Sequence, residues 1–506
     1  MRDDLTIDGS SLTIEDVQSV ALARRRVQLS PRARKGMLKT REVVDGIVSR
    51  NDVVYGVTTG FGKLSDVAIP LDKLNQLQVN LVRSHAAGVG DLLPEPEVRA
   101  MILLRANVLA KGFSGARPDI VELLLGLLNN DLYPPIPEQG SVGASGDLAP
   151  LAHLALALIG EGDILVNSVC RSAPEVLRLV GLKPITLGPK EGISLINGTQ
   201  AHTAVGVLAV ARARTLWKTA QLAGAMSLEA LLGTPVAFDE RIHKARGQRG
   251  QIAAAAVLRE LLEDSELRES HRFGDSRIQD AYCLRCIPQV HGPVLDALEW
   301  IDRVVTDELN AATDNPLVFD DGDILSGGNF HGLPVAAALD FLAISLTHLA
   351  TISERRIDRL VNPDLNEGLP PFLTGEPGLD SGFMMAQVTA AALASECKLL
   401  SHPASVDSIP TDGNKEDVVP MAMGAALKAR RVVANLQRIL AIELMCAAQG
   451  LDARLPLKPG KGVRLGHDKV RSVIPTLGDD RVLSGDIEAL SYAIAAREFS
   501  DIVGDA

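Results

Sequence analysis

The sequence predicts a mainly α-helical protein in which an irregular N-terminal domain, residues 1–197, precedes a bundle of long helices and a C-terminal helical region, residues 198–506. After residue 198, long stretches rich in Ala, Leu, Arg and Glu carry apolar residues at helical spacing. Few segments show the alternation typical of strands, and aromatic residues make up only 3% of the 506 residues. Several stretches exceed the ordinary helix length of about 11–12 residues, so we expect them to pack as a bundle or across subunit interfaces.

The composition excludes several classes of partner. The formal net charge of −12 and the absence of a basic patch argue against nucleic acid and against anionic membranes. The N-terminal residues are polar and lead into no apolar signal region, and the five cysteines are scattered. We therefore expect a cytoplasmic protein, and the composition leaves a small-molecule substrate open.

The first two hundred residues alternate short apolar runs with Gly- and Pro-rich turns, as in 55–62 and 133–137. Glycine permits positive φ and proline fixes φ, so these segments are predicted to be loops between short helices. Apolar stretches at 148–160 and 203–233 are predicted to be buried helices. Further long helices are predicted over 293–309, 334–360, 385–400 and 419–448.

Polar breaks that contain glycine separate these helices. They cover residues 194–200, 279–289, 326–331 and 411–417. Loops held by a rigid helical scaffold are where catalytic groups tend to lie, so these breaks are the first candidates for a site.

The run from Gly140 to His153, which contains Ala144-Ser145-Gly146, is the most informative segment. Taken alone, the tripeptide favours a glycine-rich turn into a helix, with Ser145 or Asp147 as N-cap. The whole run, however, closely resembles the signature of the aromatic amino acid ammonia-lyases. In that family Ala-Ser-Gly cyclises and loses water to form 4-methylidene-imidazol-5-one (MIO). The resemblance extends from Leu5 to about Phe499.

The residue types suit this chemistry. The Gly146 nitrogen must attack the Ala144 carbonyl carbon, and glycine has no Cβ to block the approach. Ser145 must lose its hydroxyl to leave a methylene group. Asp147 is a candidate acid or base for that dehydration, and the apolar helix that follows would direct its positive N-terminal end at the ring.

The resemblance implies roles for residues in the other loops. Tyr55 matches the family's base for the β-hydrogen, although free tyrosine has a pKa near 10. Asn197 matches the asparagine that holds the MIO oxygen or the substrate carboxylate. Phe330 matches the aromatic residue beside the MIO.

A further family block covers residues 279–286. Here Arg285 would bind the substrate carboxylate through two parallel hydrogen bonds. Tyr282 would support the MIO or shuttle protons, and Gln279 would orient them. Cys283 and Cys286 have CxxC spacing, but no second cysteine or histidine pair completes a metal set, and packing is the favoured interpretation.

Substrate choice in the family depends on the residues that face the substrate ring. Ser84-His85 and Glu416 match the histidine-type members, in which they bind the imidazole, and Met384 matches the same type. A histidine side chain exchanges hydrogen bonds with an imidazole but would be left unpaired by a phenyl ring. The resemblance therefore implies non-oxidative deamination of L-histidine to urocanate and ammonia.

Three departures from the histidine-type pattern leave the exact substrate open: Leu333, Lys415 and Val418. A phenylalanine- or tyrosine-specific ammonia-lyase, an enzyme for a modified histidine, or a 2,3-aminomutase therefore stays open. A helical assembly without catalysis is disfavoured because Ser145 and Tyr55 are present. The resemblance also implies a homotetrameric lyase architecture with active sites shared between subunits.

Overall fold

The computed structural model describes residues 3–167, 169–275 and 277–504. The chain forms two compact units, each assembled from separated stretches. Unit 1 comprises Met1–Ala211, Asp302–Asp340 and Pro403–Leu427, and unit 2 comprises Arg212–Ile301, Phe341–His402 and Lys428–Ala506. The domain boundary between residues 197 and 198 stays a prediction.

Short helices and small two-stranded sheets make up the N-terminal part of unit 1. The helices are α1 (Ile14–Ala21), α2 (Pro31–Arg50), α3 (Leu74–His85), α4 (Glu95–Ala110), α5 (Pro118–Asn129), α6 (Leu148–Leu158), α7 (Ala173–Leu179) and α8 (Glu191–Ile196). The strands are β1 (Leu5–Ile7), β2 (Val27–Leu29), β3 (Val89–Leu92), β4 (Pro137–Gln139), β5 (Asp163–Val166), β6 (Val169–Ser172), β7 (Leu317–Val318) and β8 (Ile324–Leu325). Strands β1 and β2 pair in parallel, and the other three pairs are antiparallel hairpins or bridges between loops.

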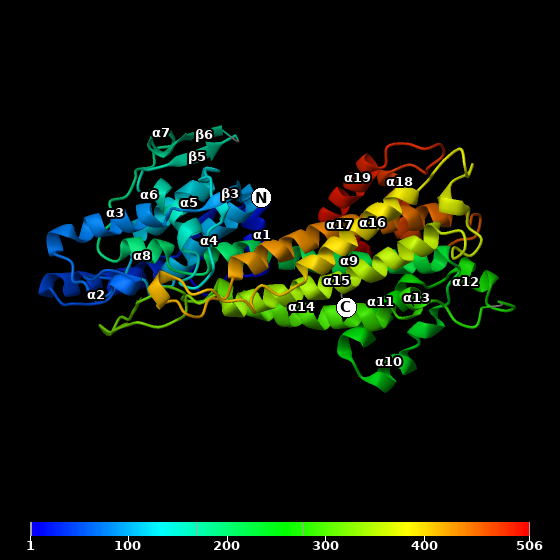
Figure 1. Cartoon of the computed structure of the whole chain (residues 1–506), viewed down its shortest axis with the longest axis horizontal. Coiled ribbons are helices and arrows are strands. Elements are labelled where there is room, and N and C mark those ends of the chain that lie inside the picture. Colours follow the sequence, from blue (N-terminus) through cyan, green and yellow to red (C-terminus); the bar gives the residue numbers. More distant parts are fainter. Residues whose placement is uncertain (1–2, 168, 276, 505–506) are drawn as a thin grey trace. The chain divides into compact units, whose positions relative to one another are not determined.

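Helix α4 is the central helix of unit 1. Every residue from Glu97 to Ala110 is buried, because apolar side chains surround the helix on all faces. It packs against α1, α5 and α2, and Figure 1 shows it among the blue and cyan helices. Two arginines, Arg99 and Arg105, lie on this buried helix and are 1% and 0% exposed.

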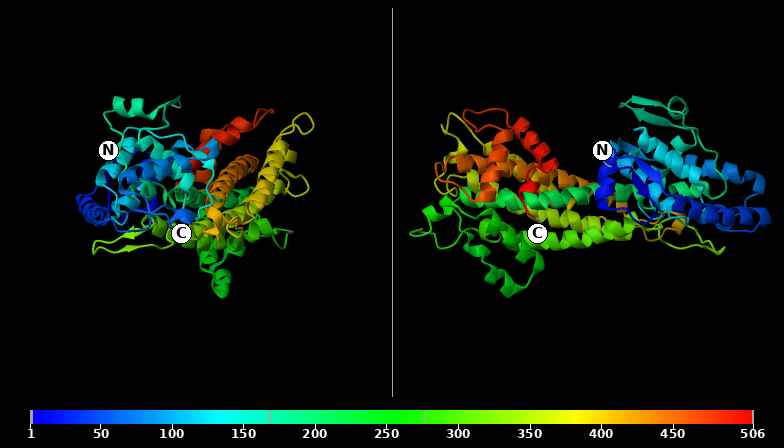
Figure 2. Two further views of the ribbon diagram at one scale, coloured as in Figure 1. Left: turned by 60° about the vertical axis from the view of Figure 1, so that its left-hand side comes forward. Right: turned by 180° about the vertical axis from the view of Figure 1, so that it is seen from behind.

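Long helices dominate the rest of the chain, and the parts of them that belong to unit 2 lie side by side, as Figures 1 and 2 show. They are α9 (Gln200–Ala230), α14 (Ile287–Leu309), α15 (Leu333–Val361), α16 (Met384–Leu400) and α17 (Ala422–Asp452). The shorter helices are α10 (Glu240–Arg246), α11 (Arg249–Leu261), α12 (Glu266–Ser270), α13 (Tyr282–Arg285), α18 (Lys461–Val473) and α19 (Ser484–Ala495). The predicted mainly α-helical fold with few strands is confirmed.

Helix α14 begins six residues before its predicted start and continues through Pro293. Proline removes one backbone hydrogen bond from a helix. The helix nevertheless persists because apolar side chains on both sides of the proline, such as Ile287 and Val294, are buried. Helices α15 and α17 are long and apolar enough to span a membrane by length and composition alone. Most of their apolar windows, 61% and 78%, are buried, as in the core helices of a folded unit.

Candidate active site

The segment that holds Ala144-Ser145-Gly146 lies in unit 1 and is held by backbone hydrogen bonds from three distant parts of the chain. Gly332 N donates to the Gly143 carbonyl oxygen at 3.0 Å, and Ala422 N donates to the Val142 carbonyl oxygen at 3.3 Å. On the other side, Asp147 N donates to the Gly198 carbonyl oxygen at 2.7 Å. The tripeptide is therefore fixed on both sides.

Gly146 and Gly198 approach one another backbone to backbone. Gly146 has a φ of +69°, and a Cβ placed on it would lie 2.1 Å from the Gly198 carbonyl oxygen. Only glycine meets both conditions, because any other residue would be strained at this φ and would collide with the neighbouring chain.

Asp147 anchors the end of this segment to helix α9. Its carboxylate accepts hydrogen bonds from Ala201 N and His202 N, each at 2.9 Å, and from the Ser141 hydroxyl at 2.7 Å. It also pairs with His202 Nδ1 at 2.8 Å, with both side chains fully buried. Burial alone would raise the pKa of Asp147, but the contacts with His202 and Ser141 bring it below its ordinary value. Both carboxylate oxygens are thus engaged, which favours an anchor over the acid or base predicted from the sequence.

Ser145 contacts two of the predicted site residues directly. Its hydroxyl donates a short hydrogen bond to Glu416 Oε1, and its carbonyl oxygen accepts one from Asn197 Nδ2 at 2.8 Å. The second oxygen of Glu416 accepts from the Thr411 hydroxyl at 2.5 Å. Asn197 Oδ1 is buried and has no hydrogen-bond partner among the described residues, so it is available to a bound molecule.

A cavity of about 700 Å³ opens beside Ser145. Seven predicted site residues line it: Tyr55, Ser84, His85, Ser145, Asn197, Phe330 and Glu416. Apolar side chains complete much of the wall, among them Phe61, Leu64, Val67, Ile69, Leu77, Leu81 and Leu148. A mostly apolar cavity with a few polar groups suits a small organic molecule. A second, more polar pocket shares Tyr55, Ser145 and Glu416 and is also lined by Ala144.

His85 is the last residue of α3, and its ring has a defined hydrogen-bonding direction. Its Nδ1 lies 2.8 Å from the Leu81 carbonyl oxygen and 3.0 Å from Ser84 Oγ. A carbonyl oxygen can only accept, so Nδ1 carries the hydrogen and Nε2 is left as an acceptor in the neutral ring.

Tyr55 lies in the loop before α3, and its hydroxyl oxygen accepts a hydrogen bond of 3.4 Å from Gly62 N. Burial, together with the carboxylates of Asp412 and Glu416, raises the pKa of Tyr55 above its ordinary value of 10.0. The side chain is therefore a neutral phenol at neutral pH in this environment.

The remaining predicted residues belong to unit 2. Tyr282 begins α13 and is 71% exposed, and the Arg285 guanidinium lies 4.5 Å from the centre of the Tyr282 ring. Arg285 Nε is buried without a hydrogen-bond partner among the described residues. Gln279 is exposed, and Met384, at the start of α16, is 37% exposed.

The structure also gives the positions of the three residues that depart from the histidine-type pattern. Lys415 and Val418 line the second, polar pocket, and Val418 is 66% exposed. Leu333 begins α15 and is 43% exposed.

Sequence reasoning missed three polar residues of the cavity, Asn80, Asn315 and Asp412. Asp412 accepts hydrogen bonds from Lys63 N at 3.0 and 3.3 Å and lines the cavity beside Tyr55. Its position in the polar break 411–417 was the available signal. Asn315 also lines the cavity, but an Asn-Pro pair indicates only a turn.

Residues 12–472 match the model of the aromatic amino acid lyase family. The chain is 55% identical over 499 residues to a histidine ammonia-lyase from Anaeromyxobacter sp. (strain K), covering 97% of this chain and 98% of the relative. Its structure is similar to the crystal structure of histidine ammonia-lyase from Trypanosoma cruzi, with a TM-score of 0.92, 44% identity, and coverage of 99% and 95% of the two chains. It is similar, too, to tyrosine aminomutase from Streptomyces globisporus, with a TM-score of 0.93, 41% identity, and coverage of 99% and 98%.

The close approach of Gly146 to Gly198 makes a prediction about stability. Gly146→Ala should lower the thermal unfolding midpoint well below that of Gly181→Ala, which shares a positive φ of +76° but has nothing within 4 Å of an added Cβ. The control bears only the left-handed backbone cost of about 1–2 kcal/mol, whereas Gly146→Ala adds a collision with the chain, typically worth about 1–3 kcal/mol more. Equal midpoints for the two variants, measured by differential scanning calorimetry, would contradict the contact.

Proposed function

Since the chain belongs to the aromatic amino acid lyase family and is a carbon–nitrogen lyase, we propose that it removes ammonia from L-histidine without oxidation, giving urocanate. The observation that carries this proposal is the shared cavity, in which His85 and Glu416 line one space with Ser145. The relatives at 50–55% identity over nearly the whole chain are histidine ammonia-lyases, which supports the same substrate.

We propose that Ala144-Ser145-Gly146 forms MIO. The Gly146 nitrogen condenses with the Ala144 carbonyl carbon, whose oxygen leaves as water. Ser145 then loses its hydroxyl with its α-hydrogen as a second water. The residues fit the group, since no Cβ obstructs Gly146 and Asn197 Nδ2 already donates to the Ser145 carbonyl oxygen. The group supplies an electrophilic methylene carbon, which withdraws electrons from the substrate and makes the elimination possible.

The chain's own residues bind and orient the substrate around this group. Tyr55 is the base for the β-hydrogen, and its phenolate must form at a site that disfavours charge. Asn197 Oδ1, buried and unpaired among the described residues, is placed to accept a hydrogen bond from the substrate's amino group. Phe330 packs beside the ring-forming segment as part of the cavity wall.

His85 and Glu416 recognise the imidazole. His85 offers an acceptor at Nε2, because its Nδ1 is committed to Leu81. Glu416 offers Oε1, which accepts from the Ser145 hydroxyl until that hydroxyl is lost as water. An imidazole supplies the N–H donor that these acceptors require. A phenyl ring would leave them desolvated without a partner, at a cost of about 1–3 kcal/mol each. Ser84 supports the orientation of His85 through its hydroxyl.

We propose that the enzyme is a cytoplasmic homotetramer whose active sites are completed by other subunits. Tyr282 and Gln279 are polar site residues that this chain leaves exposed. Arg285, whose guanidinium stacks on Tyr282, would bind the substrate carboxylate, and Met384 would line the site. Exposed residues of this kind suit a site shared between subunits.

The alternative is a related MIO enzyme that acts on another aromatic or modified amino acid, or a 2,3-aminomutase. Lys415 and Val418 favour it, since both line the pocket next to Glu416 where histidine-type members carry other residues. The likeness to a tyrosine aminomutase at 41% identity supports the same alternative.

Ultraviolet absorbance distinguishes the two functions. Purified protein incubated with L-histidine should accumulate urocanate, and Ser145→Ala should abolish that accumulation without unfolding the protein, because the variant has no hydroxyl to eliminate. Circular dichroism provides the folding control. If L-histidine gives no signal while tyrosine, phenylalanine or a methylated histidine is converted to an unsaturated acid or a β-amino acid, the alternative replaces the proposal.

The raised pKa of Tyr55 predicts how the rate depends on pH. A base must be deprotonated to act, so the active fraction and kcat should rise with pH through the range above neutrality. Tyr55→Phe should lower kcat about 10²–10⁴-fold and remove this rise. Steady-state kcat measured as a function of pH tests it, and a wild-type kcat that falls as pH rises above neutrality contradicts the role given to Tyr55.

A further inference from the structure

Helix α8, which ends directly before Asn197, is held in place by groups outside it. It has only six residues, and all of them are buried. An isolated helix of this length does not form in water, because nucleation is unfavourable and few hydrogen bonds follow. The position of Asn197 must therefore be fixed by the side chains that contact both ends of α8.

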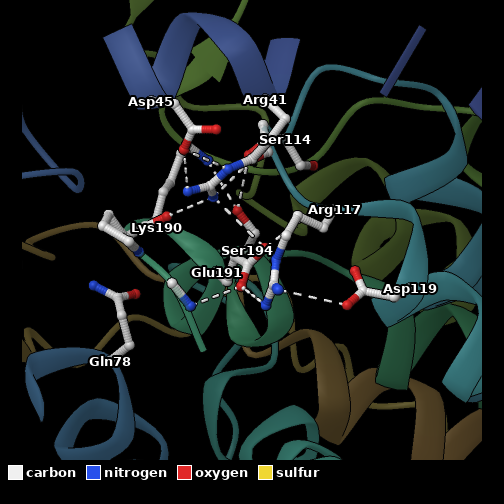
Figure 3. A network of polar contacts seen from close by, with 12 residues as sticks. Arg41, Asp45, Gln78, Ser114, Arg117, Asp119, Lys190, Glu191 and Ser194 are labelled. Carbon is white, nitrogen blue, oxygen red and sulfur yellow. Dashed lines mark hydrogen bonds and ion pairs between the residues drawn. The ribbon is translucent and has the colours of Figure 1, made fainter. Parts of the chain in front are cut away.

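A network of buried charges holds the N-terminal end, as Figure 3 shows. Glu191 is fully buried and accepts hydrogen bonds from Arg117 Nε and Nη2, each at 2.8 Å. Lys190 Nζ, also fully buried, contacts Asp314 at 2.9 Å and Ser194 Oγ at 3.0 Å. Each charge in this end of the network has an opposite charge beside it.

The C-terminal end is held by the guanidinium of Arg105, which lies on the central helix α4. Its Nη1 donates to the Ser194 carbonyl oxygen at 2.7 Å, and its Nη2 donates to the Asn197 carbonyl oxygen at 3.0 Å. Nη2 also makes a short hydrogen bond to Gln200 Oε1. The guanidinium thus bridges the last turn of α8 to the first residue of α9 and satisfies carbonyl groups that a helix end leaves free.

Arg105 is fully buried, yet all three acceptors of its guanidinium are neutral. Burial lowers the pKa of Arg105 to about 10, while the charges of Asp314 and Asp147 oppose this change, so the side chain stays protonated at neutral pH. A buried charge that makes no direct ion pair is costly to folding. Its presence here is therefore better explained by what it positions than by a gain in stability.

The guanidinium also supports the surface on which the ring-forming segment lies. A Cβ on Gly198 would lie 2.4 Å from Arg105 Nη2, so the backbone of Gly198 packs directly on the guanidinium. Gly198 in turn contacts Gly146, and Asn197 Nδ2 donates to the Ser145 carbonyl oxygen. Contacts therefore connect Arg105 to Ser145 through Asn197, and to Gly146 through Gly198.

We propose that Arg105 is a positioning residue for formation of the MIO and for its use. Resting on the proposed function, this inference assigns Arg105 the placement of Asn197 and Gly198 against Ser145 and Gly146. In this placement the Gly146 nitrogen reaches the Ala144 carbonyl carbon, and the Ser145 carbonyl oxygen keeps its hydrogen-bond donor. Without the guanidinium the loop after α8 relaxes, and both the release of the two waters and the later turnover slow.

The same helix offers a matched control. Arg99 is 1% exposed, and its guanidinium contacts the Val20 carbonyl oxygen at 3.1 Å, the Leu128 carbonyl oxygen at 3.3 Å and Asp131 at 2.8 Å. Arg99→Gln therefore removes a buried guanidinium with comparable carbonyl contacts and leaves the loop after α8 untouched.

The test measures the mass of the proteolytic peptide that contains residues 144–146, together with kcat for each ring-bearing site. We expect the peptide of the wild type and of Arg99→Gln to be lighter by two waters. In Arg105→Gln a large fraction should keep both waters, and kcat per ring-bearing site should fall about 100-fold, the scale expected for a misplacement near 1 Å. KM should rise by a smaller factor than kcat falls, because His85 and Glu416 remain in place while Asn197 is displaced. Arg105→Lys keeps the charge but loses the planar fork. Its kcat and its fraction of peptide that keeps both waters should lie between those of the wild type and of Arg105→Gln.

A second variant keeps the test decisive. If Arg105→Gln does not fold, as judged by circular dichroism, Gln200→Leu removes one partner of the guanidinium and should slow loss of the waters in the same direction. The inference is overturned if Arg105→Gln and Arg99→Gln both lose the two waters and turn over like the wild type. It is also overturned if these two variants are impaired to the same degree. If the wild-type peptide itself keeps both waters, the proposed function fails first.

Discussion

The site is organised by one contact, the approach of the Gly146 backbone to the Gly198 backbone. Two chain segments meet there without side chains between them, at a positive φ and at a distance that excludes a Cβ on Gly146. The contact brings the end of the ring-forming segment against the junction of α8 and α9. There the Asn197 side-chain amide donates a hydrogen bond to the Ser145 carbonyl oxygen. Both segments lead directly into helices, α6 on one side and α9 on the other.

Buried charges in unit 1 support this contact from several directions. Asp147 ties the ring-forming segment to the first turn of α9, while Lys190, Glu191 and Arg105 hold α8 at its two ends. Polar groups of this kind are costly to bury and stabilise a fold only when each finds partners. Their concentration around one short helix indicates that precise placement of Asn197, rather than overall stability, is what the network secures.

Much of the fold and part of the site follow from the sequence, and the limits have physical causes. Helical periodicity predicted the long helices, although α14 begins at Ile287, six residues before its predicted start, and continues through Pro293. Residues of the cavity such as Ser145 and His85 could be predicted because the motifs that contain them resemble those of the family. The partners of Asp147 and the position of Arg105 could not, because they depend on contacts between residues far apart in the chain, and a lone arginine in an apolar helix carries no sign of what it touches.

A crystal structure of the purified protein at high resolution tests the central claim most directly. Density should be continuous between the Ala144 carbonyl carbon and the Gly146 nitrogen, residue 145 should end in a planar methylene group, and the Asn197 amide should lie on the oxygen of the new ring. An ordinary peptide at 144–146 with the Ser145 hydroxyl intact, in protein that is folded and pure, would contradict the account.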